Sequence, residues 1–353
     1  MDALRVGIVG AGGYTGAELV RLCHAHPRLS IEWVAAREKA GKRLADVLPG
    51  TQGVAELGER ALEAFDPADA ADIAKRIDVA FTALPHAASA RVGKALFNAG
   101  VRVVDLSADF RLHNAATYGE WYGEHPAPEL LEQAVYGLPE LHRAELKGAR
   151  LIAAPGCYPT ASILPLAPLL ARGLVESRGL IIDAKSGVSG AGRTPSPGTH
   201  YPETAEGLRP YKIAGHHRHA PEIEQELGLV ARKEVRVVFT PHLVPMSRGI
   251  LTTAYATPKA GVTAEQCRKA ARQQYAGGLV TVLDEGRLPD TLWVRGTARA
   301  HIAYALDQRS GTLLAMGAID NLARGASAQA IQALNVALGW PDALGLPQVA
   351  TFP

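Results

Sequence analysis

A run of apolar residues at positions 4–9 leads directly into a cluster of glycines, and this junction restricts the folds open to the chain. Gly10, Gly13 and Gly16 form the pattern G-x-x-G-x-x-G, and apolar residues then recur at helical spacing. Glycines between a strand and a helix let the backbone approach a pyrophosphate at the positive end of the helix. The spacing departs from the usual G-x-G-x-x-G of dinucleotide sites, so a tight turn that only packs the helix on the strand is the alternative interpretation.

Strands and helices alternate through the first half of the chain. Apolar runs with strand character lie at residues 31–35, 79–84, 101–106 and 151–154, and a helical pattern lies at 87–99. This order predicts a parallel, doubly wound α/β sheet of the Rossmann type.

The pattern changes after Pro155. Strand-like runs follow with fewer helices between them, at residues 180–184, 234–240, 250–257, 279–283, 301–307 and 312–319. They predict a second, α+β domain built on a mixed or antiparallel sheet. Residues 321–340 return to helix, with Ile331, Leu334 and Leu338 on one face, and residues 187–201, crowded with Gly, Pro, Ser and Thr, form a long loop. Since 353 residues exceed the size of one hydrophobic core, two domains are expected.

Composition excludes several classes of function. Hydrophobic residues make up 47% and charged residues 20% of the chain, as in an ordinary globular protein. The net charge of +2 comes from 37 basic and 35 acidic residues without a lysine or arginine run, so we expect no nucleic-acid partner. No membrane-length apolar segment or targeting segment is visible, and three cysteines fit neither a disulfide framework nor paired zinc ligands. We therefore expect a cytoplasmic protein with no membrane partner.

The end of the second predicted strand indicates which dinucleotide binds. An NAD site normally places an acidic residue there to accept hydrogen bonds from the ribose hydroxyls, whereas this strand ends at Ala36 and is followed by Arg37. The acid nearby, Glu32, lies at the start of the strand, and Lys39 adds a second cation. The pattern favours NADP over NAD, and a solvated surface arginine is the alternative for Arg37.

Cys157 is the candidate nucleophile. It follows a predicted strand, lies beside Gly156, and precedes a helix expected to begin near Pro159. Free backbone N–H groups and the positive end of a helix lower the pKa of a thiol and stabilise an oxyanion, both of which favour attack on a carbonyl. Pro165 and Pro168 predict that this helix is kinked or short.

A nucleophilic cysteine needs a base, and the dense cluster of His216, His217 and His219 offers one. In an extended segment His217 and His219 point to the same side, with Arg218 opposite, and His219 is the first choice. Zinc binding and plain surface histidines are the alternatives. Because the cluster lacks a cysteine or carboxylate at ligand spacing, no metal is expected.

A phosphorylated substrate also needs cations. Arg111 and Ser107 follow the strand predicted at 101–106, at the carboxyl edge where ligands of parallel sheets bind, so they are candidate phosphate contacts. Arg193, Arg209 and Arg248 are further candidates that the sequence does not rank.

Motifs along essentially the whole chain resemble the N-acetyl-gamma-glutamyl-phosphate reductase family of the aspartate-semialdehyde dehydrogenase superfamily. They are GAGGYTGAE at 10–18, ALPH at 83–86, SADFRL at 107–112, YGLPE at 136–140, PGCYPT at 155–160, SGVSGAGR at 186–193, HRHAPEI at 217–223 and AIDNL at 318–322. Each motif is moderately specific alone, and their order makes the set specific.

The resemblance implies roles for individual residues and for domains. It implies Cys157 as nucleophile and His219 as acid/base, with substrate contacts from Tyr211, His217 and Glu222 beside Ser107 and Arg111. The expected cofactor contacts are Gly10, Gly13, Tyr14, Thr15, Gly16, Arg37, Pro85, Ser186, Gly187 and Asn321. The resemblance places Ser186 near the substrate as well, and Arg37 stands where the family often has serine or threonine. The resemblance further implies an NADP-binding domain of residues 1–155 and 321–353, a catalytic and dimerisation domain of residues 156–320, and a homodimer or homotetramer.

The implied reaction is the NADPH-dependent reduction of N-acetyl-L-glutamyl 5-phosphate to N-acetyl-L-glutamate 5-semialdehyde and phosphate, through a thioester on Cys157, in arginine biosynthesis. The related alternatives are the paralogous aminoadipate-phosphate reductase of lysine biosynthesis and aspartate-semialdehyde dehydrogenase itself. A non-catalytic NADP-binding regulator and a Cys–His hydrolase are alternatives of other classes. The pair Cys157 and His219 argues against the regulator, and the glycine turn argues against the hydrolase.

Overall fold

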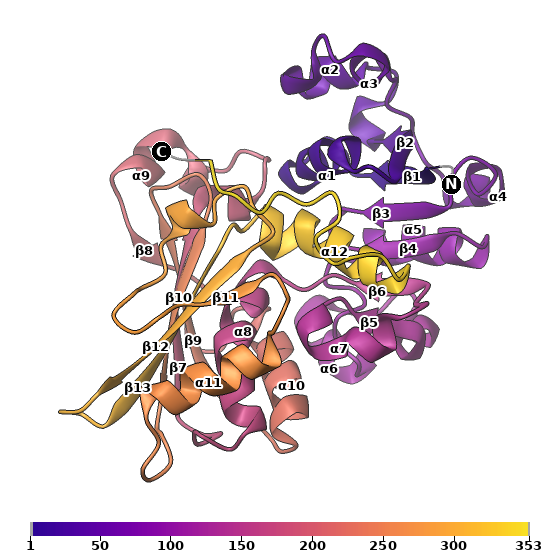
Figure 1. Ribbon diagram of the computed structural model, residues 1–353. Helices are drawn as coiled ribbons and strands as arrows, with labels where there is room; N and C mark the ends of the chain where they lie inside the picture. The colour runs from indigo at the N-terminus through magenta and orange to yellow at the C-terminus, as the bar shows by residue number, and fades with distance from the viewer. Residues whose placement is uncertain (1–2, 352–353) are drawn as a thin grey trace. The chain divides into compact units, whose positions relative to one another are not determined.

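A computed structural model describes residues 3–351, which form two compact units (Figure 1). The first unit extends from the start of the described chain to Pro155 and also contains Ala326–Leu346. The second unit contains Gly156–Gly325 and the described residues from Pro347. The chain therefore returns to the first unit at Ala326 rather than at the predicted residue 321, and it leaves that unit again after Leu346.

The first unit is built on a parallel sheet with the strand order β2-β1-β3-β4-β6-β5. The strands are β1 (Leu4–Val9), β2 (Leu29–Ala35), β3 (Val79–Thr82), β4 (Arg102–Asp105), β5 (Ala134–Tyr136) and β6 (Leu151–Ala153). The predicted parallel, doubly wound sheet is confirmed. In this sheet β5 was not predicted; it has three residues and only one of them, Tyr136, is buried, whereas β6 has the same length but is buried throughout and shows an apolar run.

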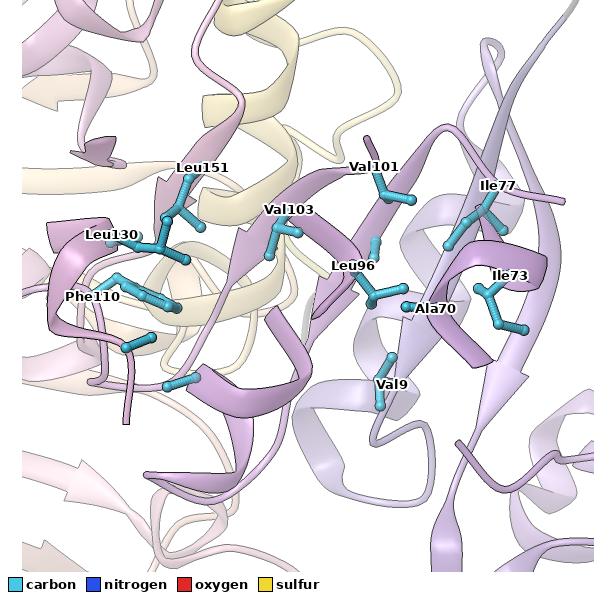
Figure 2. Packing of buried hydrophobic residues seen from close by; sticks show 14 of the residues in the cluster. Val9, Ala70, Ile73, Ile77, Leu96, Val101, Val103, Phe110, Leu130 and Leu151 are labelled. Carbon is cyan, nitrogen blue, oxygen red and sulfur yellow. The ribbon is translucent and has the colours of Figure 1, made fainter. Parts of the chain in front are cut away.

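Eight α-helices of the described chain belong to the first unit. They are α1 (Tyr14–Ala25), α2 (Leu44–Val47), α3 (Ala55–Glu59), α4 (Ala70–Ile73), α5 (Ala88–Asn98), α6 (Ala115–Tyr122), α7 (Pro139–Leu146) and α12 (Ala328–Ala337). Figure 2 shows buried apolar side chains of this unit: Leu96 of α5 lies near Val103 of β4 and Ala70 of α4, and Phe110 lies beside Leu130. Each such side chain contributes about 1.5–3 kcal/mol by leaving water.

Helix α12 is buried along its whole length and packs on β4, β6 and α7 of the same unit. Ile331 and Leu334 of the predicted apolar face are fully buried. The buried polar side chains are also paired: Gln329 Nε2 donates to the Gly137 carbonyl at 2.6 Å, and Asn335 Oδ1 lies 3.2 Å from His26 Nε2. These hydrogen bonds explain how a helix with polar residues on several sides lies inside the unit.

The second unit is built on a mixed sheet with the order β11-β12-β13-β10-β7-β9-β8. The prediction of a mixed or antiparallel sheet is confirmed. β7 and β9 pair in parallel, β11 and β12 pair in parallel, and the other neighbours pair antiparallel. The strands are β7 (Leu180–Gly187), β8 (Arg209–Pro210), β9 (Val237–Val244), β10 (Ile250–Ala256), β11 (Val280–Val282), β12 (Ala300–Asp307) and β13 (Thr312–Ile319).

The α-helices of the second unit are α8 (Cys157–Ala171), α9 (Tyr201–Ala205), α10 (Ala220–Ala231) and α11 (Ala264–Gln274). Helix α8 packs on β10 and β13 and on the helices α10 and α11. The loop predicted at 187–201 contains two short 3₁₀ turns, Val188–Ala191 and Pro197–Thr199. Across residues 3–351, no helix has both the length and the apolar character needed to cross a membrane.

Helix α8 continues through two prolines. Pro165 and Pro168 lack the N–H groups that would bond the carbonyls one turn earlier. The Thr252 hydroxyl donates to the carbonyl freed by Pro165 at 2.9 Å, and the Tyr275 hydroxyl donates to the carbonyl freed by Pro168 at 2.7 Å. The prediction of a short helix is therefore wrong: α8 has 15 residues, because hydroxyls of the surrounding unit replace the missing donors.

Candidate active site

Cys157 is the first residue of α8 and is partly exposed. Gly156 precedes the helix with extended backbone, and its carbonyl accepts bonds from the N–H and the hydroxyl of Thr160 at 2.9 and 3.0 Å. The first turn of α8 is uncharged, so the positive end of the helix acts on the thiol without a neighbouring acidic residue in that turn. Cys23 and Cys267 are both buried, and burial raises the pKa of Cys267 to about 11. Exposure and helix position therefore distinguish Cys157 from the other two thiols.

Glu222 connects α10 to the residue before the nucleophile. It lies in the first turn of α10, is 2% exposed, and its Oε1 accepts a hydrogen bond from the Gly156 N–H at 2.8 Å. This bond fixes the backbone that leads into Cys157. The sequence pointed to Glu222 as a substrate contact, whereas the geometry also gives it a contact with the nucleophile turn.

Aromatic and imidazole rings lie around Tyr158, the residue that follows Cys157 in the sequence. The Tyr158 ring has its centroid 5.5 Å from that of His217 and 6.0 Å from that of His219, and the two imidazoles are 4.9 Å apart. Tyr211 donates its hydroxyl to the Tyr158 hydroxyl at 3.0 Å, and Phe239 packs against His217. The predicted base and two predicted substrate contacts thus belong to one cluster around Tyr158, the residue that follows Cys157, while Phe239 was not predicted.

His217 is held as a neutral imidazole. Burial, followed by the charges of Lys212 and Arg218, lowers its pKa to about 4. The backbone N–H of His219 donates to His217 Nδ1 at 3.1 Å, so neutral His217 carries its proton on Nε2. Nε2 is the nitrogen with which His217 can donate a hydrogen bond.

The histidine segment has a different backbone from the predicted extended one. Lys212, Ala214 and Gly215 have φ values of 46°, 55° and 81°, so the chain turns sharply before it reaches His217. His219 has helical φ and ψ angles and precedes α10. The extended assumption is wrong, although the two imidazoles still come together, because the turn and the start of α10 orient them.

A second cluster surrounds Asn321, which follows β13. Its Oδ1 accepts from the Gly249 N–H at 2.7 Å, and its Nδ2 donates to the Ser189 hydroxyl at 2.9 Å. Ser186 and Gly187 end β7, two strands from β13 in the sheet, and the Gly187 N–H donates to the Gly249 carbonyl at 2.9 Å. Ser186 and Asn321 are both 2% exposed. The second unit therefore brings together three predicted cofactor residues from segments far apart in the sequence.

Asp320, the residue before Asn321, supports this cluster through a buried ion pair and hydrogen bonds. The carboxylate is fully buried, forms an ion pair with Arg248 at 3.0 Å, and accepts backbone N–H bonds from Gly296, Leu322 and Ala323 at 2.6 to 2.9 Å. Arg248, one of the arginines that the sequence did not rank, is therefore tied to this aspartate.

Gly325 lies against Cys157, the candidate nucleophile, and the sequence did not single it out. It belongs to the π-helical turn Ala323–Ser327, and a Cβ at this position would lie 2.7 Å from Cys157 Cβ. Such turns within helices often mark functional sites. The available signal was an isolated glycine between AIDNL and a helical pattern, which by itself is too common to single out.

The glycine turn of the first unit fits a dinucleotide. Gly10 has a φ of 91°, and a Cβ there would lie 2.3 Å from the Ala83 carbonyl oxygen, while a Cβ at Gly16 would lie 2.2 Å from the Gly10 carbonyl oxygen. At Gly13, in contrast, the nearest atom to a Cβ would be 3.8 Å away, so this side of the turn has room for a ligand. Gly13 precedes the uncharged first turn of α1, which directs its N–H groups toward an anion.

The other predicted residues of this turn lie close by in the first unit. Tyr14 and Thr15 open α1, and the Thr15 carbonyl accepts from the Ser327 hydroxyl at 3.0 Å. Pro85 lies in the segment that follows β3. The N–H of Ala83 in this segment donates to the Val9 carbonyl at 2.8 Å, which holds the segment beside the glycine turn.

Arg37 and Lys39 form a short 3₁₀ helix with Glu38 after β2. Arg37 is exposed, whereas Lys39 is half-buried, and its Nζ lies 3.3 Å from the Gly12 carbonyl oxygen. The structure thus brings Lys39, rather than Arg37, to the glycine turn.

Ser107 and Arg111 are buried at the carboxyl end of β4. The Ser107 hydroxyl donates to Asp105, whose pKa is raised by burial and by the charge of Asp109. Arg111 Nε and a terminal nitrogen donate to the carbonyls of Ala154 and Leu106 at 2.7 and 2.8 Å. The guanidinium is therefore fixed at the edge where β4 and β6 end, and its contact with a phosphate stays a prediction.

Within the described part of the chain, no group of three or more His, Cys, Asp or Glu side chains could hold a metal ion.

Comparison with known proteins places this arrangement in a class. Residues 5–149 match the family described as semialdehyde dehydrogenase, NAD binding domain, and residues 157–321 match semialdehyde dehydrogenase, dimerisation domain. Solved structures agree on the fold: aspartate semialdehyde dehydrogenase II from Vibrio cholerae, complexed with ASA, has a TM-score of 0.69 at 16% identity, covering 95% of this chain and 98% of that one. The enzyme from Candida albicans, solved with NADP, has the same TM-score and identity, and 95% of this chain and 98% of that chain are covered. The fold and the two matched domains are those of the semialdehyde dehydrogenases.

Full-length relatives define the family more narrowly. The chain is 47% identical over 351 residues to the N-acetyl-gamma-glutamyl-phosphate reductase of Citrifermentans bemidjiense, covering 99% of this chain and 100% of that protein. It is 48% identical over 352 residues to the enzyme of the same name from Magnetococcus marinus, covering 99% of each. The chain belongs to the N-acetyl-gamma-glutamyl-phosphate reductase family and is an oxidoreductase with an NAD(P)-binding Rossmann domain.

Proposed function

We propose that this enzyme reduces N-acetyl-L-glutamyl 5-phosphate to N-acetyl-L-glutamate 5-semialdehyde and phosphate, with NADPH as reductant, in the arginine biosynthesis of the cytoplasm. The observation that carries the proposal is the fixation of Cys157 from both sides: Gly156 before it bonds Glu222, and the Tyr158 ring after it contacts the imidazole of His219. A partly exposed thiol at a helix start is the nucleophile that covalent acyl transfer needs, and His219, which contacts the next residue along the chain, is the proposed base.

Cys157 and His219 divide the acyl-transfer step between them. His219 takes the proton of the thiol, and the thiolate forms a bond to the acyl carbon while the bond to the phosphate oxygen breaks. The products of this step are a thioester on Cys157 and free phosphate. Backbone N–H groups at the start of α8 stabilise the oxyanion that forms on the way.

When bound, NADPH supplies the hydride that reduces the thioester to the oxidation level of the aldehyde. Gly10, Gly13, Tyr14, Thr15, Gly16, Arg37, Pro85, Ser186, Gly187 and Asn321 are the proposed contacts of that cofactor. The sulfur of Cys157 is the leaving group when the semialdehyde is released, and His219 returns the proton that completes the reaction.

Substrate contacts are proposed from two groups of side chains. Tyr211 and His217 line the cluster beside Tyr158, with His217 Nε2–H as a donor to the substrate. Glu222 completes this group, and Ser107 and Arg111 are the proposed phosphate contacts. Burial raises the pKa of Tyr211 to about 12, so its hydroxyl stays protonated and acts as a hydrogen-bond donor.

We infer that the second unit assembles with a second copy of itself, because it matches a dimerisation domain and exposes an apolar row on its sheet. Leu314, Tyr255, Ile181 and Val238 are cross-strand partners on β13, β10, β7 and β9. Tyr255, Ile181 and Val238 are 36%, 43% and 57% exposed. Contiguous apolar surface of this kind favours association into a homodimer or homotetramer. Ile181→Glu should shift the mass in sedimentation to that of one chain, and an unchanged mass would place the contact elsewhere.

The direct test is phosphate-dependent reduction of NADP by the purified protein. N-acetyl-glutamate 5-semialdehyde, aspartate semialdehyde and the aminoadipate analogue are compared as substrates in the reverse reaction. Turnover with the first alone supports the proposal. Turnover only with the aminoadipate analogue assigns the enzyme to the lysine-type reaction, and NADP binding without turnover on any of them assigns a regulator.

A further inference from the structure

Lys39 contacts the glycine turn of the first unit at Gly12. The ammonium of Lys39 donates to the Gly12 carbonyl oxygen at 3.3 Å, and the position of a Cβ on Gly12 would lie 2.9 Å from Lys39 Nζ and 3.1 Å from its Cδ. A side chain at position 12 would therefore push the ammonium away. The glycine at position 12 makes room for this particular cation.

The short helix after β2 directs its three charged side chains differently. A 3₁₀ helix has about 3 residues per turn, so Arg37, Glu38 and Lys39 point in three directions around its axis. Arg37 and Glu38 are exposed, whereas Lys39 is half-buried against the turn. Among these three side chains, Lys39 is the one with a hydrogen bond to the segment that leads into α1.

The carboxylate that the fold brings to the end of β2 is neutralised by its own cation. Glu63 pairs with Ala35 in a parallel bridge, and its carboxylate oxygens accept from Arg76 at 2.7 and 2.8 Å. The bond from Arg76 also lowers the pKa of Glu63. Glu63 is thus already engaged, while Lys39 carries three N–H donors and uses one on Gly12.

We propose that Lys39 selects the 2′-phosphate of the adenosine ribose, and so determines the preference of this enzyme for NADPH over NADH. The end of β2 beside the glycine turn is where a Rossmann domain contacts the adenosine ribose, and a cation there accommodates a 2′-phosphate. An ammonium binds phosphate as a compact point charge, and its contact with Gly12 holds it at this edge. The inference rests on the proposed function for the identity of the cofactor.

The test measures direct binding to the complete protein without turnover. Dissociation constants for NADPH, NADH, 2′,5′-ADP and 5′-AMP are measured by calorimetry for the wild type, Lys39→Met and Lys42→Met. Lys42 is an exposed lysine three residues further along the chain and serves as the matched control. Lys39→Met should raise the dissociation constants of NADPH and 2′,5′-ADP by about 10- to 100-fold and leave those of NADH and 5′-AMP within about twofold. Lys42→Met should leave all four unchanged.

A double-mutant cycle tests the link to Gly12. Gly12→Ala should weaken 2′,5′-ADP binding in the wild-type background, because its Cβ displaces the ammonium, and should have no effect in Lys39→Met. Equal losses for NADPH and NADH in Lys39→Met would assign Lys39 to the shared pyrophosphate and overturn the proposal. Unchanged NADPH binding in Lys39→Met would also overturn it, while leaving the proposed reaction intact. A wild type that binds neither dinucleotide would contradict both.

Discussion

The Glu222 carboxylate accepts a hydrogen bond from the Gly156 N–H at 2.8 Å, across 66 positions of sequence. This bond joins the first turn of α10 to the residue that precedes α8, and Cys157 begins that helix. Because Glu222 is 2% exposed, the N–H has little access to water, and loss of the carboxylate leaves it without an equivalent acceptor.

Removal of this acceptor should slow the chemistry of the thiol itself. Glu222→Ala is expected to lower the stability by about 1–3 kcal/mol and to slow alkylation of Cys157 by iodoacetamide several-fold in the absence of substrate. Glu222→Gln keeps an oxygen acceptor and should retain most of the alkylation rate. Glu206→Ala, which removes an exposed carboxylate of the same unit, is the control. An unchanged alkylation rate in Glu222→Ala, together with a raised KM, would limit Glu222 to substrate binding.

Cys157 should be the thiol that carries both labelling and turnover. Iodoacetamide should modify Cys157 well before the buried Cys23 and Cys267, and the extent of labelling should match the loss of activity. Cys157→Ser should fold and bind NADPH, yet lose turnover by at least about 1000-fold, since a serine hydroxyl is not ionised there. Peptide mass spectrometry locates the label, and comparable turnover in Cys157→Ser would refute the thioester.

Gly325 should tolerate no side chain. The Cβ of Gly325→Ala would lie 2.7 Å from Cys157 Cβ and 3.2 Å from its Cα, so the nucleophile has to move. We expect kcat to fall by at least about 10-fold while the Kd for NADPH stays the same, because a displacement on the order of 1 Å at a reacting group is costly. Gly119→Ala in α6 is the matched control, since a Cβ there meets nothing within 4 Å. Equal kcat values for the two variants would show that Cys157 adapts freely.

His217 should make the stability depend on pH below neutrality. Its pKa is about 4 in the folded protein and 6.5 as the ordinary value, so the unfolded chain binds the proton more readily. The contribution of neutral His217 to the free energy of unfolding is therefore complete above pH 6.5 and is lost as the pH falls toward 4. This contribution amounts to at most about 3 kcal/mol. Urea unfolding at several pH values should show a shallower fall in His217→Asn than in the wild type. Identical slopes between pH 6.5 and 4 would mean that His217 titrates normally in the folded state.

Local patterns in the sequence were sufficient for much of the first unit. The strand at 4–9, the glycines at 10, 13 and 16 and the helix that follows were predicted because each depends on neighbours within a few residues. The position of Cys157 after a strand and at the start of a helix also followed from local patterns, while its reactivity stays a prediction. The extended backbone expected for His217 and His219 was wrong, because three residues before them adopt left-handed conformations that no periodicity reveals.

By itself, then, the sequence determined the order of most strands and helices and the glycine turn, and it singled out Cys157 and the histidine segment as candidates, because these properties follow from spacing along the chain. The tertiary structure alone decided that Glu222 bonds Gly156, that Gly325 lies against Cys157, and that Lys39 rather than Arg37 contacts the glycine turn. It also decided that hydroxyls from β10 and α11's end support α8 at its prolines. The physical reason is that such contacts join residues far apart in sequence, and their geometry depends on how whole elements pack.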